Sequence, residues 1–281
     1  MSVRTAYLTG GAHGIGLAVT ERLVARGIKV AIADLDLDRA KEVAATLNAQ
    51  QNADLVSSYQ VDVSNWESQR QAFTKAVEDL GRIDLVFPIA GIGENRSWLP
   101  KDPHSTEFTK PDLTIIDVNL TGFLYTSSIA IQQMRKQAVD EYGFRGKILA
   151  AASICGFYCA STIPVYTASK HGVVGFVRSY GKHLPEEGIA LNAVCPNVVR
   201  TGINDTSFYN ILDQRGLLTD IRDVVNAFES FVDNNMSGEC AEVGPNGGFT
   251  IKSPTEYLDR ESEEVVKYIA EGHRHLHSST K

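Results

Sequence analysis

Short apolar runs alternate along the chain with longer segments in which apolar residues recur at a helical period. Most of the short runs are continuously apolar, which is typical of strands covered by helices on both faces. These runs predict strands at Ala6–Thr9, Lys29–Asp34, Val56–Val61, Ile83–Pro88, Lys147–Ala152 and Ala190–Cys195. The segments between them predict helices at Ile15–Arg26, Asp38–Ala49, Trp66–Leu80, Leu113–Gln137 and Val165–His183.

Strand–helix alternation of this kind predicts an α/β fold. Right-handed crossovers then give a single Rossmann-type doubly wound parallel sheet flanked by helices on both faces. No repeat, linker or shift in composition divides the chain, so we expect one domain over residues 1–281, with residues 251–281 as a C-terminal extension. Ligands of such sheets bind beyond the carboxyl ends of the strands. Functional residues are therefore expected just after each strand.

Composition narrows the classes of partner. The chain is 43% hydrophobic and carries a formal net charge of -7, which suits one domain with a large core and gives no electrostatic reason to bind nucleic acid or an anionic membrane. We see no apolar run near the roughly 20 residues of a membrane span, and MSVRTAYLTGG leaves no room for an apolar signal region. We therefore expect a cytoplasmic protein that binds a small molecule, without nucleic acid or membrane.

The cysteines do not indicate a metal site. Cys155, Cys159, Cys195 and Cys240 lack the tight pairs with nearby histidines that such a site needs, so we expect buried or half-buried free thiols. The stretch HRHLH, residues 273–277, is interpreted as a solvated terminus.

A glycine-rich turn follows the first predicted strand in TGGAHGIG, residues 9–16. Gly10, Gly14 and Gly16 would let the backbone turn tightly and approach a pyrophosphate. Ile15 opens a helix whose N-terminus carries positive partial charge toward it. Because this turn lies between a strand and a helix, it predicts dinucleotide binding.

The second predicted strand ends at Asp34, about 20 residues past the glycines, where a carboxylate can accept hydrogen bonds from the adenosine ribose. Such a carboxylate would repel a 2′-phosphate, and Leu35 offers no charge to offset it. NAD is therefore favoured over NADP, although His13 in the glycine turn is a candidate phosphate neighbour. A helix N-cap is the alternative role for Asp34.

Two further strand ends complete the expected cofactor cleft. Asp62 and the backbone of Val63 follow the third strand and are placed to meet the adenine edge, while Asp62 could instead cap the helix near Asn65. The small Ala90 and Gly91 follow the fourth strand and would let the backbone lie close to the cofactor.

The candidate chemistry lies further along the chain. Asn119 sits among apolar neighbours on a long predicted helix, either as a structural hydrogen bonder or as the holder of an active-site water. Ser153 follows the fifth strand, and Tyr166 and Lys170 lie one turn apart on the next helix. The Lys170 ammonium, with a positive nicotinamide ring nearby, would lower the tyrosine pKa from about 10 and make Tyr166 a general base. Ser153 would hold the substrate oxygen.

Together, TGGAHGIG, Asp34, Asp62, the AG of PIAGIG, VNLTG, Ser153, YTASK and CPNVVRTG resemble the short-chain dehydrogenase/reductase family over roughly residues 3 to 250. The resemblance implies a catalytic tetrad. Its members are Asn119, Ser153, Tyr166 and Lys170. It also implies that Lys170 grips the nicotinamide ribose, that Asn119 holds a water in a proton relay, and that Val199 and Thr201 bind the nicotinamide carboxamide. The stretches YTASKHGVVGFVRS and LNAVCP are most similar to 15-hydroxyprostaglandin dehydrogenase-like enzymes, which oxidise secondary alcohols with NAD.

The chain departs from the family pattern at two places. Pro88 and Ile89 stand where the family usually has two asparagines before Ala-Gly, so the central strands must be tied together differently. Asn197 replaces the usual glycine after Pro196, and asparagine still tolerates unusual backbone angles. Homo-oligomers, dimers or tetramers, are common in the family through the helices around residues 113–137 and 165–183.

Residues 202–220 follow the expected nicotinamide contact and are interpreted as a substrate lid. Its bulky side chains either dock the lid on the sheet or contact substrate: Ile203, Phe208, Tyr209, Ile211 and Leu212. Cys155, Phe157 and Tyr158 are expected to face them. An apolar pocket of this kind favours a bulky secondary alcohol of lipid, terpenoid or polyketide type. A non-redox scaffold, isomerase or cyclase on this fold and an NADP-dependent ketoreductase are the alternatives.

Overall fold

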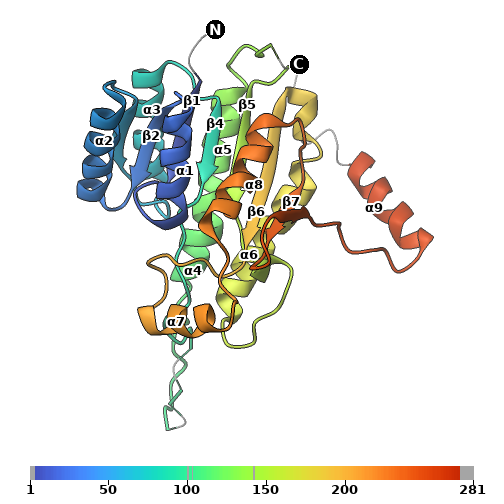
Figure 1. The fold of residues 1–281 in the computed structure, drawn as a ribbon. Helices are drawn as coiled ribbons and strands as arrows, with labels where there is room; N and C mark the ends of the chain where they lie inside the picture. Colours follow the sequence, from blue (N-terminus) through green and yellow to red (C-terminus); the bar gives the residue numbers. More distant parts are fainter. Residues whose placement is uncertain (1–3, 100, 103, 142, 273–281) are drawn as a thin grey trace.

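The computed structural model describes residues 4–99, 101–102, 104–141 and 143–272. The chain forms one eight-stranded sheet in the order β3-β2-β1-β4-β5-β6-β7-β8 (Figure 1). The strands are β1 (Thr5–Thr9), β2 (Lys29–Asp34), β3 (Val56–Gln60), β4 (Leu85–Pro88), β5 (Gly146–Ala151), β6 (Ile189–Pro196), β7 (Cys240–Val243) and β8 (Phe249–Ile251). The first seven pair in parallel, and β8 pairs antiparallel with β7. The predicted doubly wound α/β fold is confirmed.

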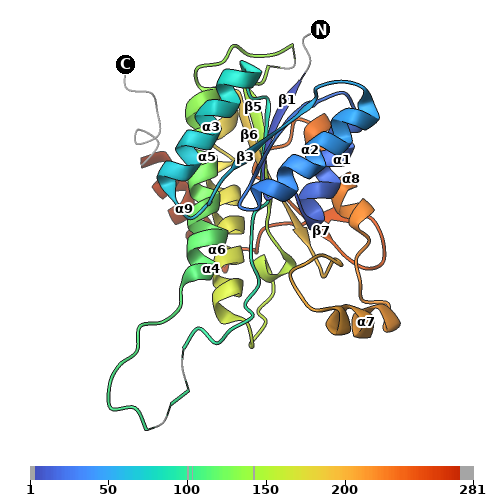
Figure 2. The same ribbon diagram turned by 90° about the vertical axis from the view of Figure 1, so that its left-hand side faces the viewer.

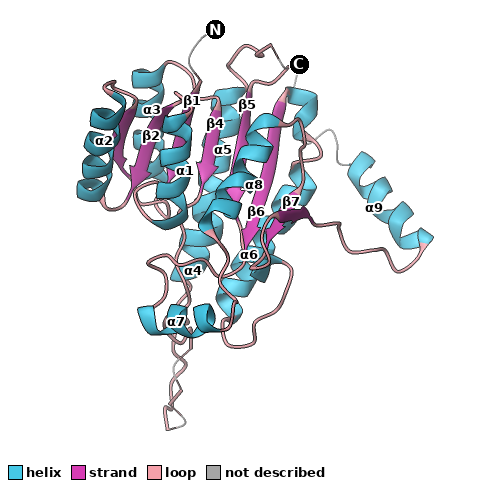
Figure 3. Ribbon diagram, in the orientation of Figure 1, coloured by secondary structure: helices cyan, strands magenta, loops and turns pink. Residues whose placement is uncertain are grey.

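The helices cover both faces of this sheet (Figure 3). They are α1 (Gly14–Ala25), α2 (Leu37–Gln51), α3 (Trp66–Leu80), α4 (Thr114–Ile116), α5 (Gly122–Met134), α6 (Pro164–Tyr180), α7 (Thr206–Gln214), α8 (Ile221–Asp233) and α9 (Arg260–Gly272). A π-helical segment, Asp117–Thr121, joins α4 to α5. The prediction of one regular helix over Leu113–Gln137 is therefore wrong, because a π-helical segment interrupts it. The sequence interpretation also missed β7, β8, α8 and α9.

Alternate strand residues point to opposite faces and build two cores. Ala6 and Leu8 of β1 pack with side chains of α1, α2 and α8, whereas Tyr7 between them packs with side chains of α3, α5 and α6. Figure 2 shows the two helix layers on either side of the sheet. Because the strands are covered on both faces, they are continuously apolar in sequence, as their pattern predicted.

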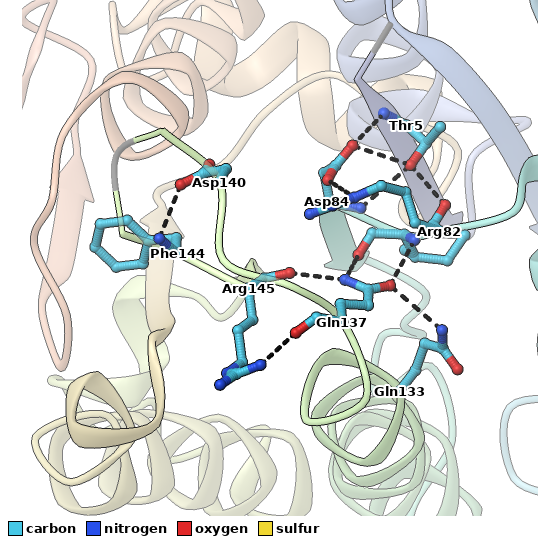
Figure 4. Close-up of polar contacts among 9 residues, drawn as sticks. Thr5, Arg82, Asp84, Gln133, Gln137, Asp140, Phe144 and Arg145 are labelled. Atoms are coloured by element: carbon cyan, nitrogen blue, oxygen red, sulfur yellow. Dashed lines mark hydrogen bonds and ion pairs between the residues drawn. The ribbon is translucent and has the colours of Figure 1, made fainter. Parts of the chain in front are cut away.

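A polar cluster fixes the amino ends of the central strands, at the end of the sheet away from the glycine turn (Figure 4). The Asp84 carboxylate accepts a hydrogen bond from the Thr5 backbone N–H at 2.9 Å. Buried Gln137, just past α5, donates to the carbonyls of Ile83 at 3.0 Å and Arg145 at 2.7 Å. These bonds satisfy backbone groups at the ends of β4 and β5 and hold α5 in register with the sheet.

The stretch Thr114–Met134 is, by length and composition, apolar enough to cross a membrane, with a mean hydropathy of 1.2. The expectation that no segment passes this test is therefore wrong. Phe123, Ala130 and Ile131 of this stretch pack in the core beneath the sheet. A core helix of a folded domain meets the same criterion, so the composition of this segment is explained by its burial.

Outside the core, the cysteines and the C-terminal segment only partly match expectation. Cys195 and Cys240 are buried and Cys155 is half-buried, but Cys159 is exposed, which corrects the prediction of four shielded thiols. In the described part of the chain, no cluster of His, Cys, Asp and Glu could hold a metal ion. Helix α9 buries none of its residues and stands apart from the sheet layers (Figure 1). The HRHLH stretch, residues 273–277, lies outside the described residues.

Candidate active site

A cavity of about 800 Å³ lies beyond the carboxyl ends of strands β1 to β6, where the topology predicted a ligand site. It is lined by every residue predicted to bind the cofactor. These are Gly10, Gly14, Ile15, Gly16, Asp34, Asp62, Val63, Ala90, Gly91, Tyr166, Lys170, Val199 and Thr201. Ser153 lines it too, whereas Asn119 lies behind the wall. The structure therefore brings together residues separated by almost two hundred positions.

The glycine turn leaves an open helix N-terminus at one end of the cavity. His13 is the N-cap of α1 and makes no side-chain capping hydrogen bond, and the first turn holds no acidic residue. A Cβ at Gly16 would collide with the Gly10 carbonyl oxygen, and one at Gly14, where φ is 49°, would press on Thr201. Uncapped N–H groups beside a side-chain-free cradle fit the pyrophosphate of a dinucleotide.

Asp34 lines the end of this cavity at which the sequence predicted the adenosine ribose. Its Oδ2 accepts a hydrogen bond from the Ala12 backbone N–H at 3.0 Å and its Oδ1 accepts one from Asp36 at 3.1 Å. The alternative of an N-cap is wrong, because Asp36 caps α2 by accepting from the Arg39 N–H at 3.1 Å. Leu35 beside it is 67% exposed and uncharged. The Nε2 of His13 lies 3.2 Å from the Oδ2 of Asp36. The imidazole predicted as a phosphate neighbour therefore faces a carboxylate.

Asp62 does not cap the following helix either. Asn65 is the N-cap of α3, and its side-chain oxygen accepts from Ser68. The Asp62 carboxylate instead accepts from the N–H and hydroxyl of Ser64, at 2.9 and 2.6 Å, and so holds the turn after β3. Asp62 and Val63 line the cavity on the side of Asp34. This position fits the predicted contact with an adenine edge.

The end of β4 shows how the chain manages without the two asparagines usual in the family. Thr9 of β1 accepts hydrogen bonds from Ile89 through its carbonyl at 3.2 Å and from Ala90 through its hydroxyl at 3.4 Å. On the other side, β4 pairs with β5 only at Leu85 and Val86, because Pro88 has no N–H to donate. Thr9 therefore ties the central strands together. Asn197, the second departure, does not have a positive φ. Among the described non-glycine residues, only Asn52 has one.

Asn119 fixes the loop that follows β4. Its Oδ1 accepts from the Ile92 N–H at 2.8 Å, and its Nδ2 donates to the Ile92 carbonyl at 2.9 Å and to the Ser169 hydroxyl at 3.4 Å. Asn119 lies in the π-helical segment and is 2% exposed. Of the two roles left open by the sequence, the structural one is present. A π-helical bulge is a frequent feature of functional sites and here turns the amide toward Ile92.

Three side chains converge at the centre of the cavity. Tyr166 and Lys170 lie one turn apart on α6, with the lysine Nζ 5.6 Å from the tyrosine ring centre. Ser153, just past the end of β5, lines the cavity with them, and its Oγ accepts a hydrogen bond from the Cys155 backbone N–H at 3.2 Å. The Lys170 ammonium donates to the Ala151 carbonyl at 3.0 Å, so it is aimed at the end of β5. A Cβ at Gly91 would lie 3.2 Å from the Asn119 Oδ1, a tight contact, so the glycine leaves room for the Asn119 amide.

The electrostatics of this group differ from the expectation. Burial raises the pKa of Tyr166, and its hydrogen bond with Ser153 offsets only part of that rise. Burial also lowers the pKa of Lys170 to about 8. The predicted lowering of the Tyr166 pKa is therefore wrong for the protein alone. The second positive charge in that prediction was the nicotinamide ring, so a bound cofactor would have to supply the opposing effect.

Residues 202–220 border the other end of the cavity. Tyr209 of α7 is 2% exposed, and its hydroxyl lies 3.2 Å from the Thr201 hydroxyl and accepts from the Asn204 N–H at 3.1 Å. Tyr209 therefore docks the segment, while Ile203 and Phe208 line the cavity with it. Ile211 and Leu212 do not line it. Docking is therefore shown for Tyr209, and substrate contact stays a prediction for Ile203 and Phe208.

Opposite this segment the prediction was partly wrong. Cys155 lines the cavity, but Phe157 and Tyr158 do not. The Arg178 guanidinium packs over the Phe157 ring, with its Cζ 5.1 Å from the ring centre. The Tyr158 hydroxyl donates a hydrogen bond to the Glu242 carboxylate. The wall is instead supplied by residues that the sequence interpretation did not single out: the apolar Ile92, Ile154 and Ile163, with Thr162 beside them. Each follows a strand end or precedes α6, which is the sequence feature that could have located them.

The comparisons with known proteins agree with this architecture. A model described as short chain dehydrogenase matches residues 4–211. The chain belongs to the short-chain dehydrogenase/reductase family. Human (Homo sapiens) 15-hydroxyprostaglandin dehydrogenase, whose name specifies NAD(+), is 33% identical over 202 residues, 71% of this chain and 70% of that protein. The short-chain dehydrogenase/reductase ascJ of Acremonium egyptiacum is 32% identical and spans 71% of this chain and 64% of its own.

Solved structures show the same fold. Type-2 3-hydroxyacyl-CoA dehydrogenase from Mycobacterium avium superposes with a TM-score of 0.74 at 25% identity, over 89% of this chain and 97% of that one. NADPH-dependent 3-quinuclidinone reductase from Rhodotorula rubra has a TM-score of 0.73 at 23% identity, over 87% and 91%. The family comprises oxidoreductases that use NAD(P) on the CH–OH groups of small molecules and are commonly oligomeric.

Proposed function

We propose that this chain is an NAD-dependent dehydrogenase that oxidises a bulky, apolar secondary alcohol to a ketone. The observation that carries the proposal is the Ser153–Tyr166–Lys170 group in one cavity with the glycine turn and Asp34. The family relationship establishes an oxidoreductase acting on CH–OH groups. Cofactor choice, substrate size and the role of each residue are the parts proposed here.

Asp34 supports NAD over NADP. Both of its oxygens already accept backbone hydrogen bonds, and a ribose with free 2′- and 3′-hydroxyls could donate to their remaining lone pairs. A 2′-phosphate at the same place would meet this carboxylate, and the basic residue that lines this end of the cavity, His13, already faces the Asp36 carboxylate at 3.2 Å. The relative whose name specifies NAD(+) is consistent with this choice.

The roles of the side chains follow from their positions. Bound NAD would supply the hydride acceptor for the carbinol carbon. Ser153 would hold the substrate hydroxyl in line with Tyr166, whose phenolate takes the hydroxyl proton as the carbonyl forms. Lys170 would hold the nicotinamide ribose and favour the phenolate, and Asn119 would keep the wall of the site in place. In the reverse direction the same phenol returns the proton to the ketone oxygen.

The substrate end of the cavity supports an apolar alcohol. Ile92, Ile154, Ile163, Ile203 and Phe208 line it, and complete burial of one such side chain against a ligand is worth about 1.5–3 kcal/mol. A small polar alcohol would leave these groups in contact with water. Residues 202–220 would act as the lid that closes over a bulky substrate.

Self-association is the remaining part of the proposal. The outer faces of α5 and α6 carry a hollow of about 470 Å³ lined by Leu124, Ile131, Phe176 and other side chains. This supports a homo-oligomer, a dimer or tetramer, through the helices predicted from the family resemblance.

The test is a rate measurement with a matched series of secondary alcohols of increasing apolar bulk, each with NAD and with NADP, following absorbance of the reduced cofactor. We expect kcat/KM to rise with bulk and to be higher with NAD. A flat series, a preference for short polar alcohols, or no reduced cofactor with any alcohol would contradict the proposal.

A further inference from the structure

Glu94 caps the helix that carries Tyr166. It lies in the loop after β4, and its Oε2 accepts a hydrogen bond from the Tyr166 backbone N–H at 2.8 Å. Helix α6 starts with Pro164, which has no N–H, and its N-cap residue Ile163 has no side-chain acceptor. The Tyr166 N–H is one of the donors that a helix N-terminus leaves unpaired. A carboxylate at this place also interacts favourably with the helix dipole.

The same carboxylate lines the substrate end of the cavity. Its neighbours there are the apolar side chains of Ile92, Ile163 and Ile203. Asn95, next in the loop, donates to the Ile203 carbonyl at 3.3 Å, so this loop joins the start of α6 to the segment that bears α7. Glu94 is therefore held at the junction of the reacting group and the apolar wall.

In the described part of the chain, no Lys, Arg or His forms an ion pair with Glu94. Of the basic residues that line the cavity, His13 stands beside Asp36 at the adenosine end. Lys170 turns its ammonium to the Ala151 carbonyl. At the substrate end, Glu94 therefore stands among mainly apolar side chains and has no ion-pair partner in the described part of the chain.

We propose that Glu94 is a specificity-determining residue that excludes anionic alcohols, such as free carboxylic acids and phosphate esters, from the pocket. The substrate class is then an apolar secondary alcohol that is neutral or carries a basic amine. This rests on the proposed function and narrows its substrate. Two like charges in one apolar-walled cavity are weakly screened by salt, so the anion should bind at least about tenfold less tightly than a neutral analogue.

The capping and the charge of Glu94 are separable by mutation. Glu94→Gln removes the charge but keeps an oxygen that can accept from the Tyr166 N–H. Glu94→Ala removes both. Glu107→Gln removes the same charge from an exposed position in the same connection between β4 and α4, outside the cavity lining, and controls for net charge.

The experiment measures binding by calorimetry, with NADH present, of three probes that share one long carbon chain and one secondary hydroxyl. Their far ends are a carboxylate, its methyl ester and the corresponding amine. For the wild-type protein and Glu107→Gln we expect the ester and amine to bind at least about tenfold more tightly than the carboxylate. In Glu94→Gln the carboxylate should approach the ester. Turnover of the ester should survive in Glu94→Gln and fall in Glu94→Ala.

Equal binding of carboxylate and ester to the wild-type protein would overturn the inference, and so would an ester preference that persists in Glu94→Gln. Absence of binding by all three probes would overturn it too, because the apolar neutral ester must bind. Binding with the expected preference but no NADH formation from NAD and the ester would contradict the proposed function and leave the role of Glu94 supported.

Discussion

The side-chain amide of Asn119 exchanges two hydrogen bonds with the backbone of Ile92, one in each direction, at 2.8 and 2.9 Å. This exchange joins the π-helical segment before α5 to the loop after β4. The same loop carries Glu94, whose carboxylate holds the first turn of α6 at Tyr166. The position of the tyrosine thus depends on an amide from a different helix, through a loop of only a few residues.

Asn119→Leu should therefore cost stability and also turnover. The substitution would leave the N–H and carbonyl of Ile92 without partners, and an unsatisfied buried polar group costs roughly 1–3 kcal/mol. We expect urea unfolding to show a loss in that range, with kcat reduced further than cofactor affinity. Gln50→Leu, at an exposed position of α2 that lines neither hollow, is the control and should leave both unchanged. Unaltered stability in Asn119→Leu would contradict the structural role.

Burial of the Lys170 ammonium should lower the free energy of unfolding of the cofactor-free protein, and this loss should depend on pH. Its pKa of about 8 lies below the ordinary value of 10.5 because of burial, so the unfolded chain binds more protons between these values and stability rises with pH across that window. Below pH 8 the Lys170 side chain is charged in the folded protein, so its desolvation lowers the free energy of unfolding. The hydrogen bond from this ammonium to the Ala151 carbonyl offsets part of that loss.

We expect Lys170→Met to stabilise the cofactor-free protein by about 1–2 kcal/mol at pH 7, since one pKa unit corresponds to about 1.4 kcal/mol and the lost hydrogen bond subtracts from the gain. The gain should shrink toward pH 10. Thermal unfolding at both pH values checks this, and activity should fall by at least about 10²-fold. Destabilisation at pH 7, or a gain independent of pH, would show that burial of charge is not the main effect.

Cofactor preference can be altered at the end of β2. Asp34→Asn together with Leu35→Arg keeps an acceptor for the Ala12 N–H, removes the charge that would repel a 2′-phosphate and adds a cation. We expect the ratio of kcat/KM for NAD to that for NADP to fall at least about tenfold. Leu35→Arg alone should change it less. Tighter binding of NADPH than NADH to the wild-type protein would refute the argument from Asp34.

The two sides of α7 give a matched test of the apolar pocket. Phe208 lines the cavity, whereas Ile211 on the same helix is 51% exposed and does not. Phe208→Ala should lower kcat/KM for a bulky alcohol about tenfold, close to the loss of one partly buried apolar contact. A short alcohol should be little affected, and Ile211→Ala should behave as wild type. Equal effects of the two substitutions on the bulky alcohol would count against a lid that contacts substrate.

The strand-end chemistry could be predicted from sequence because it depends on the order of elements. Continuous apolar runs located the first six strands, and residues just past them, such as Asp34 and Ser153, had to meet at one edge of a parallel sheet. The relative positions of Tyr166 and Lys170 follow from helical spacing alone. These inferences need only local periodicity and topology.

What could not be predicted depends on packing between distant segments. The sequence from Leu113 to Gln137 has the pattern of one helix. Nothing local predicts that Asn119 lies in a π-helical segment from which its amide reaches Ile92. Burial raises the pKa of Tyr166 where a count of neighbouring charges suggested the opposite. The strands β7 and β8 are too short to give a clear sequence pattern. They form by pairing in turn on the β6 edge of the sheet.

The most direct test of the account is the rate of NADH formation by Tyr166→Phe with NAD and the best bulky secondary alcohol of the series. Tyr158→Phe is the control, because Tyr158 is 47% exposed and outside the cavity lining. We predict a loss of at least about 10²-fold in kcat for Tyr166→Phe, with NADH binding retained and Tyr158→Phe near wild type. Near-normal turnover by a folded, NADH-binding Tyr166→Phe protein would contradict it.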